Sequence, residues 1–379
     1  MLAATPPMGW NSWNMFGATV NAEVIKQTAD AIVSGGLKDA GYRYIVIDDF
    51  WQGGRGEDGK LFPDPQRFPE GMKALADYVH ERGLLFGLYS DAGLQTCGGR
   101  PASQDFEEVD ARTFAGWGAD YLKYDWCHAE DTRANAEYRY GKMAAALRAT
   151  GREIVFSICE WGHHSPWLWG ANAGGNLWRT TGDIGDSWRD VPVAWGVLYG
   201  IESIGFEQQR GLEAYAGPGC WNDPDMLVVG LNGGSRTIAG AGCTPIEYRT
   251  HFALWCMLAA PLMIGCDVCR LDPLTREILT NKELIALDQD LLGKQGFRAS
   301  RNGFCELWKK PLSGGGLGVA LFNRDNKRQT AHGHWSDLEI TGRYRIRDAG
   351  SHEDRSESSS EVTADLDPHG CAAYCLTSI

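Results

Sequence analysis

Residues 44–51 read YIVIDDFW, a short β-branched apolar run that passes directly into two carboxylates, Asp48 and Asp49. Such a run is typical of a strand that is buried on both faces of a parallel sheet. In parallel α/β barrels the functional side chains collect at the carboxyl ends of the strands, because the loops there converge on one mouth. The stretch therefore predicts a buried strand with functional carboxylates at its end.

The same succession of apolar run and polar cluster recurs along the chain to about residue 290. The further expected strands are residues 84–89, 121–124, 154–158, 177–180, 219–222 and 262–265. Amphipathic segments separate them, and the expected helices at residues 21–40, 71–82 and 105–118 end at or beside glycine, a frequent residue at helix C-termini. Strands that alternate with helices predict an α/β fold, a (β/α)8 TIM barrel, over residues 1–295.

The pattern changes in the last part of the chain. Short alternating segments such as FCELWKK and GLGVALFN are separated by glycine, serine and asparagine, and few helical patterns remain. We therefore expect a small antiparallel β-sandwich domain over residues 296–379.

The charge balance restricts the partners. Lys and Arg number 36 against 49 Asp and Glu, a formal net charge of −13, and no basic run is present, so binding to nucleic acid or to an anionic membrane is not expected. The chain has no apolar run of membrane-spanning length, and MLAATPPMGW lacks the charged and apolar regions of a signal peptide. We expect a cytoplasmic protein with a neutral or cationic substrate, and no motif bears on its oligomeric state.

Carboxylates are concentrated at the expected strand ends, where only Lys123 and Arg179 accompany them as cations. The set comprises Asp48, Asp49, Asp125, Glu160, Asp183, Asp223 and Asp225. Crowded carboxylates raise one another's pKa, so such a cluster is costly unless a ligand or a reaction uses it. A single strand-end Asp is most simply a helix N-cap, but this interpretation weakens as the number of carboxylates grows.

A metal site is the second interpretation. Lys123 and Arg179 would compete with a hard cation in the same mouth. The nine histidines form no ligand motif, since His163 and His164 are adjacent and would point apart on a strand, and the CDVC segment that begins at Cys266 is more typical of a protein core. We expect neither a metal nor a cofactor.

Glycoside hydrolysis is the third interpretation, because it requires two carboxyl groups that face one bond from different loops. Asp125 follows Lys123 by two positions, so both side chains of an extended strand point the same way, and the ammonium would keep Asp125 ionised and nucleophilic. Asp183 lies in the glycine-rich segment RTTGDIGD just after an expected strand, where a turn can direct it across the mouth.

Nine segments, taken in order, resemble the signature segments of the α-galactosidase and α-N-acetylgalactosaminidase family, glycoside hydrolase family 27. They are PPMGWNSW, IDDFW, GLYSDAG, QTC, LKYDWC, CEWG, WRTTGDIGDSW, GPGCWNDPDML and AAPLMIGCD. The resemblance covers roughly the first 300 residues, and LDQDLLGKQG matches the junction to the family's C-terminal β-sandwich. It implies a retaining exo-α-galactosidase that uses a double-displacement mechanism and no cofactor.

The resemblance also implies residue roles. Asp125 matches the nucleophile and Asp183 the general acid/base, and Arg179 matches a sugar contact. Asp48 and Asp49 match the pair that binds the 4- and 6-hydroxyls of galactose. The remaining substrate-binding matches are Trp13, Tyr89, Cys97, Lys123, Cys159, Glu160, Trp161, Asp225 and Met226, and Cys97 is expected to form a disulfide with Cys127 beside the site.

Substrate choice is expected to depend on Glu160 and Trp161, because CEWG matches the family segment that faces the 2-position of the sugar. Members that accept N-acetylgalactosamine carry small residues there, so two bulky residues favour galactose. The alternatives are a β-L-arabinopyranosidase, an α-N-acetylgalactosaminidase and, in another class, a non-catalytic sugar-binding barrel. The intact aspartates at positions 48 and 49 disfavour the first, and the presence of both catalytic carboxylates disfavours the last.

The chain departs from the family pattern at two positions. Phe50 replaces the cysteine of the eukaryotic IDDCW motif, so at most one family disulfide is expected and an oxidising compartment is not required. Trp126 replaces a small or polar residue after the nucleophile. Its side chain would either narrow the pocket or form an aglycone platform, or it would face the core.

Overall fold

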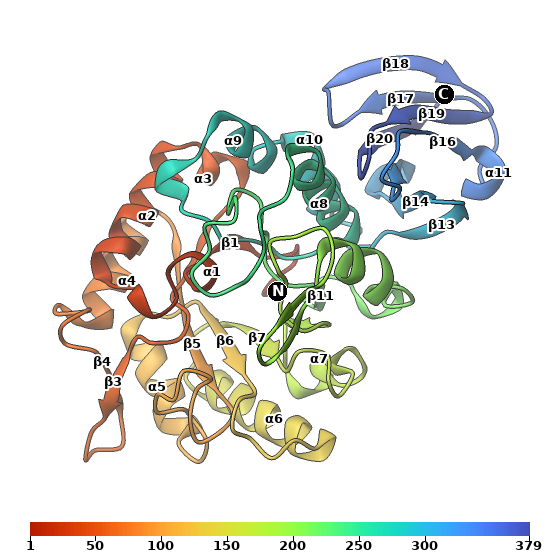
Figure 1. Cartoon of the computed structure of the whole chain (residues 1–379). Helices are drawn as coiled ribbons and strands as arrows, with labels where there is room; N and C mark the ends of the chain where they lie inside the picture. Colours follow the sequence, from red (N-terminus) through yellow and green to blue (C-terminus); the bar gives the residue numbers. More distant parts are fainter.

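Eight parallel strands form the central sheet of the computed structural model, which describes residues 1–379 (Figure 1). In chain order they are β1 (Met8–Asn11), β2 (Tyr44–Val46), β5 (Leu85–Asp91), β6 (Tyr121–Asp125), β7 (Val155–Cys159), β8 (Leu177–Arg179), β11 (Trp221–Asp223) and β12 (Leu262–Ile264). From β1 to β11 each strand pairs with the next, and β1 also pairs with β12. A parallel bridge between Leu227 and Ile264 joins the segment after β11 to β12. The predicted α/β barrel is confirmed.

Strand β1 is the one barrel strand that the sequence pattern did not predict. Its sequence, MGWN, contains no β-branched residue, and its extended state depends on pairing with β2 on one side and β12 on the other. Gly9 permits the close approach of β2, because a Cβ at this position would lie 2.4 Å from the carbonyl oxygen of Tyr44. Trp10 is fully buried, and its indole N–H donates to the carbonyl of Cys266.

Helices surround the sheet (Figure 1). They are α1 (Trp13–Phe16), α2 (Ala22–Ser34), α3 (Leu37–Ala40), α4 (Gly71–Glu81), α5 (Glu107–Trp117), α6 (Arg133–Ala149), α7 (Gly170–Ala173), α8 (Pro245–Leu258), α9 (Pro273–Leu279) and α10 (Lys282–Asp288). The prediction of one helix over residues 21–40 was wrong, because Gly36 adopts a φ of +82° and separates α2 from α3. Helix α5 ends at Gly118, a left-handed C-cap, as its pattern predicted.

Two antiparallel hairpins project from the barrel loops. The first joins β3 (Gln52–Arg55) to β4 (Leu61–Pro63), and the second joins β9 (Val191–Val193) to β10 (Gly196–Leu198). No helix of the structure combines the length and the apolar character that crossing a bilayer requires.

The predicted antiparallel β-sandwich is also confirmed, and its first strand begins at Phe297. A six-stranded sheet has the spatial order β13 (Phe297–Asn302), β14 (Cys305–Pro311), β15 (Leu317–Asn323), β20 (Cys371–Ser378), β17 (Tyr344–Asp348) and β18 (Glu353–Ser358). The second layer comprises β16 (Gln329–His334), β19 (Glu361–Leu366) and the short helix α11 (Trp335–Leu338). Leu321 of the large sheet and Val362 of the small one belong to the same apolar core.

The barrel and the sandwich share a continuous apolar interface. Trp308 and Phe322 of the sandwich belong to the same cluster of 74 buried residues as the barrel core. The ring of Phe206 from the barrel packs edge to face against both of them, with centroid distances of 6.0 Å to Trp308 and 5.1 Å to Phe322. The sandwich therefore packs against one side of the barrel. It is coloured blue in Figure 1.

Candidate active site

A pocket at the carboxyl ends of the barrel strands gathers side chains from distant parts of the sequence. It is lined by Trp13, Asn14, Asp48, Asp49, Tyr89, Cys97, Lys123, Asp125, Trp161, Arg179, Asp183, Asp225 and Met226. Parallel strands bring these segments to one mouth, as in other barrels of this kind. Every predicted site residue lines the pocket except Cys159 and Glu160.

The carboxylate of Asp48, just after β2, is held by three hydrogen bonds. Its Oδ2 accepts from Lys123 Nζ at 2.8 Å and from Asn11 Nδ2 at 2.7 Å, and its Oδ1 accepts from the backbone N–H of Asp49 at 2.9 Å. The ion pair between Asp48 and Lys123 is largely buried. The direct partner of Lys123 is therefore Asp48 and not Asp125.

Asp125 lies at the end of β6, and its carboxylate accepts one hydrogen bond, from the backbone N–H of Trp126 at 3.1 Å. Burial raises the pKa of Asp125 to about 7; the Lys123 ammonium opposes this shift, and the charge of Asp183 adds to it. The Lys123 ammonium favours the ionised form of Asp125, as expected, but burial has the larger effect on its pKa. The carboxyl group changes its protonation state close to neutral pH.

Arg179 contacts two aspartates of the same pocket, Asp183 and Asp225. Its Nη2 lies 3.1 Å from Asp183 Oδ1 and 3.0 Å from Asp225 Oδ2. The side chain of Asp183 is 44% exposed, whereas that of Arg179 is only 4% exposed. Burial raises the pKa of Asp225 to about 6 against the opposing charge of Arg179. Asp183 therefore lies near the pocket mouth, where the buried guanidinium of Arg179 holds its carboxylate.

Asp49 and Trp13 form another side of the pocket, and the ring of Phe50 packs against Trp13. Asp49 accepts from the backbone N–H of Phe50 at 2.6 Å and of Gly98 at 2.7 Å, and burial raises its pKa. Trp13 stacks on Phe50 with the ring planes 8° apart and centroids 6.1 Å apart. Phe50 occupies a left-handed backbone conformation, φ +74°, which places its ring beside the site. A flat aromatic surface therefore lies next to carboxylates that accept hydrogen bonds.

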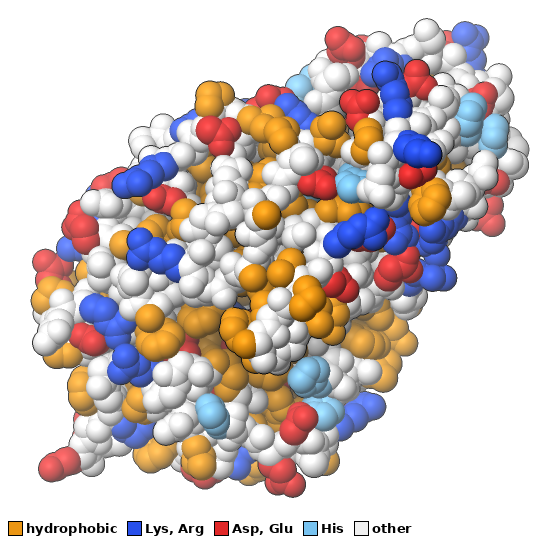
Figure 2. All heavy atoms as spheres, viewed as in Figure 1, with side chains coloured by type: hydrophobic (Ala, Val, Ile, Leu, Met, Phe, Trp, Pro, Cys, Tyr) orange, Lys and Arg blue, Asp and Glu red, His pale blue; other side chains and the backbone are white.

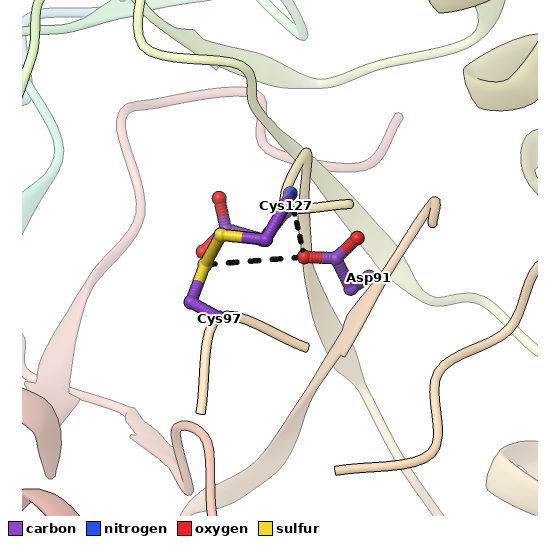
Figure 3. Close-up of side chains that lie close together, drawn as sticks. Asp91, Cys97 and Cys127 are labelled. Carbon is purple, nitrogen blue, oxygen red and sulfur yellow. Dashed lines mark hydrogen bonds between the residues drawn. A yellow bond between two sulfur atoms is a disulfide. The ribbon is translucent and has the colours of Figure 1, made fainter. Parts of the chain in front are cut away.

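The predicted disulfide between Cys97 and Cys127 is confirmed, and a buried aspartate lies against it (Figure 3). Asp91, at the end of β5, accepts from the backbone N–H of Cys127 at 2.9 Å and from that of Gly93 at 2.7 Å. Burial and, second, the nearby charge of Asp125 raise the pKa of Asp91 well above its usual range. No role was predicted for Asp91, although the GLYSDAG segment carries the same strand-end signal as IDDFW.

Cys159 and Glu160 are not among the side chains that line this pocket, although Cys159 lines an adjoining cavity that shares Lys123, Arg179, Asp225 and Met226 with it. Cys159 is buried behind Arg179, and its Sγ lies 3.8 Å from Nη1. Glu160 is fully buried, its Oε2 accepts from the backbone N–H of His164 at 2.8 Å, and burial raises its pKa to about 8. The backbone turns at Trp161, where φ is +58°. Of the two bulky residues Glu160 and Trp161, only Trp161 lines the pocket.

Trp126 faces the core, so it is not a wall of the pocket. It is 3% exposed, stacks on Tyr140 with a centroid distance of 5.6 Å, and donates from its indole N–H to Asp131 at 3.1 Å. Asn14, by contrast, lines the pocket without having been predicted, and its buried Nδ2 has no hydrogen-bond partner. The sequence signal that could have indicated Asn14 is its position next to Trp13, a predicted site residue.

The parallel barrel and its pocket of paired carboxylates define a glycoside hydrolase. The family model for α-galactosidase A matches residues 5–290, and the model for the α-galactosidase C-terminal β-sandwich domain matches residues 302–376. The chain belongs to the α-galactosidase family, glycoside hydrolase family 27.

Relatives share both domains with this chain. An α-galactosidase of Cyamopsis tetragonoloba is 46% identical over 380 residues, which cover 99% of this chain and 87% of that protein. A candidate α-galactosidase structure from Bacteroides fragilis superposes with a TM-score of 0.95 at 48% identity and covers 99% of this chain and 80% of that one. The structure of a Saccharomyces cerevisiae α-galactosidase with raffinose has a TM-score of 0.92 at 30% identity and covers 99% of this chain and 98% of that one.

Proposed function

We propose that this chain is a retaining exo-α-galactosidase that hydrolyses terminal α-linked galactose from oligosaccharides or glycoconjugates. The observation that carries the proposal is that two carboxyl groups from different segments of the barrel, Asp125 and Asp183, line one pocket. Asp125 is 5% exposed, whereas the side chain of Asp183 is 44% exposed and contacts Arg179. Glycoside hydrolysis requires two carboxyl groups that face one bond, and the motif match assigns the attack to Asp125 and the proton transfer to Asp183.

In the first step, ionised Asp125 attacks the anomeric carbon and forms a glycosyl ester. Protonated Asp183 gives its proton to the glycosidic oxygen, whose bond to the anomeric carbon breaks, and the aglycone leaves as an alcohol. In the second step, water attacks the same carbon, Asp183 takes the proton from that water, and the ester bond breaks to release Asp125. Two inversions give net retention.

Recognition of galactose follows from the hydrogen-bond groups around Asp125. The Asp48–Lys123 ion pair offers an acceptor and a donor, and Asp49 offers a second acceptor, for the 4- and 6-hydroxyls. Trp13 packs against the apolar face of the ring. Trp161 limits the space at the 2-position, which favours galactose over N-acetylgalactosamine. An α-galactoside substrate agrees with the raffinose bound to the yeast relative.

The test is a panel of aryl glycosides combined with stereochemistry. We expect hydrolysis of the aryl α-galactoside and weak or no hydrolysis of the α-N-acetylgalactosaminide and the β-L-arabinopyranoside. Proton NMR of the first-formed product should show α-galactose. A preference for either of the other glycosides would reassign the substrate, and initial β-galactose would exclude the double displacement.

A further inference from the structure

Two histidines and a glutamate converge on the outer face of the small sheet of the sandwich. His332 and His334 are two positions apart on β16, so both side chains project from the same face of the strand. Glu361 of β19 lies directly opposite His334 in the antiparallel register. Histidine side chains are visible on the surface of the sandwich in Figure 2, in the region where Figure 1 shows β16.

The donor atoms of these side chains are already close together. His332 Nδ1 lies 3.1 Å and His334 Nδ1 lies 3.2 Å from the same oxygen, Glu361 Oε2. The two imidazole planes are 17° apart with centroids 5.7 Å apart. In a tetrahedral zinc site with bonds of roughly 2.0 to 2.1 Å, neighbouring ligand atoms are about 3.3 Å apart. The nitrogen–oxygen distances therefore match a site that needs little rearrangement.

We propose that His332, His334 and Glu361 form a surface binding site for a divalent transition metal ion, with zinc as the best match. Imidazole nitrogens favour zinc over calcium or magnesium, which take oxygen ligands, and the carboxylate completes three protein ligands with a fourth position for water. The net charge of −13 also favours a cation over an anion.

The site is accessible and is built from sandwich strands outside the catalytic pocket. The side chains of His332 and His334 are 47% and 54% exposed, so an ion can reach them without unfolding of the domain. Both line a cavity that Ser300 and Asp337 also line. A bound ion would link β16 to β19, so it would stabilise the sandwich and leave the hydrolysis of α-galactosides unchanged.

The experiment is zinc titration of the full chain by isothermal calorimetry after treatment with EDTA and exchange into metal-free buffer. Cys269 is an exposed free thiol that could bind zinc separately, so all measurements use a Cys269→Ser background. We expect one ion per chain and a rise in Tm with zinc. His332→Ala, His334→Ala and Glu361→Gln should each weaken binding at least tenfold and abolish the rise in Tm.

Thr330→Ala is the matched control, because Thr330 lies on the same face of β16 but donates its hydroxyl proton to Asp365 and is no part of the cluster. Its zinc affinity should equal that of the background protein, and aryl α-galactoside hydrolysis should confirm that every variant folds. His332→Gln keeps a polar side chain if His332→Ala fails to fold. The absence of saturable zinc binding, or equal binding in His332→Gln and the background protein, would overturn the proposal.

Discussion

Lys123 Nζ lies 2.8 Å from Asp48 Oδ2, so the ammonium on β6 is bound by a carboxylate just after β2 and not by Asp125, two positions further along its own strand. The same cation therefore performs two tasks. It fixes the carboxylate that we propose as an acceptor of hydrogen bonds from the substrate, and it lowers the pKa of Asp125 through space.

The wild-type enzyme should lose activity as the pH falls through about 7, because burial raises the pKa of Asp125 to about 7 and only the ionised carboxylate can attack. The pH profile of kcat/KM reports groups of the free enzyme, so its acidic limb should fall in this range. A limb at the pKa of an ordinary aspartate, about 3.9, would contradict the assignment.

Lys123→Met should lower kcat/KM and move the acidic limb to higher pH. Loss of the ammonium removes the charge that lowers the pKa of Asp125, and it leaves Asp48 without its cationic partner. Lys123→Arg keeps the charge and is the control, with a smaller displacement of the limb expected. An unchanged limb in Lys123→Met would show that Lys123 has no influence on Asp125.

Asp125→Asn should reduce kcat on the order of 10³-fold or more, since the amide cannot form the ester intermediate. Azide should restore partial turnover and give β-galactosyl azide. Circular dichroism should match the wild type, because the amide is isosteric with the carboxyl group. Full activity without azide would place the nucleophile elsewhere.

Trp161→Ala should raise activity on the aryl α-N-acetylgalactosaminide relative to the α-galactoside, since Trp161 lines the pocket. Glu160→Gln is the matched control, because the adjacent side chain points into the protein and accepts from the backbone N–H of His164. The ratio of the two activities should stay constant in this control. A change in ratio only in Glu160→Gln would reverse the assignment.

Replacement of Cys97 and Cys127 by serine should lower the free energy of unfolding by about 2 to 4 kcal/mol, the usual contribution of a disulfide. It should also raise KM, because Cys97 lines the pocket and the bridge ties its loop to the segment after β6. Urea denaturation and steady-state kinetics measure the two effects. Unchanged KM would restrict the disulfide to a stabilising role.

Local composition was sufficient for most of the barrel. Tyr44–Val46 and Val155–Cys159 are buried strands whose β-branched and apolar residues already indicate extended structure. Met8–Asn11 lacks that signal, and its extended state arises from hydrogen bonds to strands on both sides. The break between α2 and α3 was also missed, because the amphipathic pattern continues past Gly36, whose left-handed conformation ends the first helix.

The sequence by itself determined which residues lie at or just after the strand ends, because the chain fixes the number of residues between each apolar strand and the carboxylate that follows it, as for Asp125 and Asp183. Only the tertiary structure decided which side chains contact one another. The backbone turn at Trp161 leaves Glu160 buried. The position of β6 in the barrel brings Lys123 into contact with Asp48. His334 meets Glu361 only through the register of β16 and β19. Such contacts depend on backbone turns and strand pairing between distant segments, which no local pattern of residues encodes.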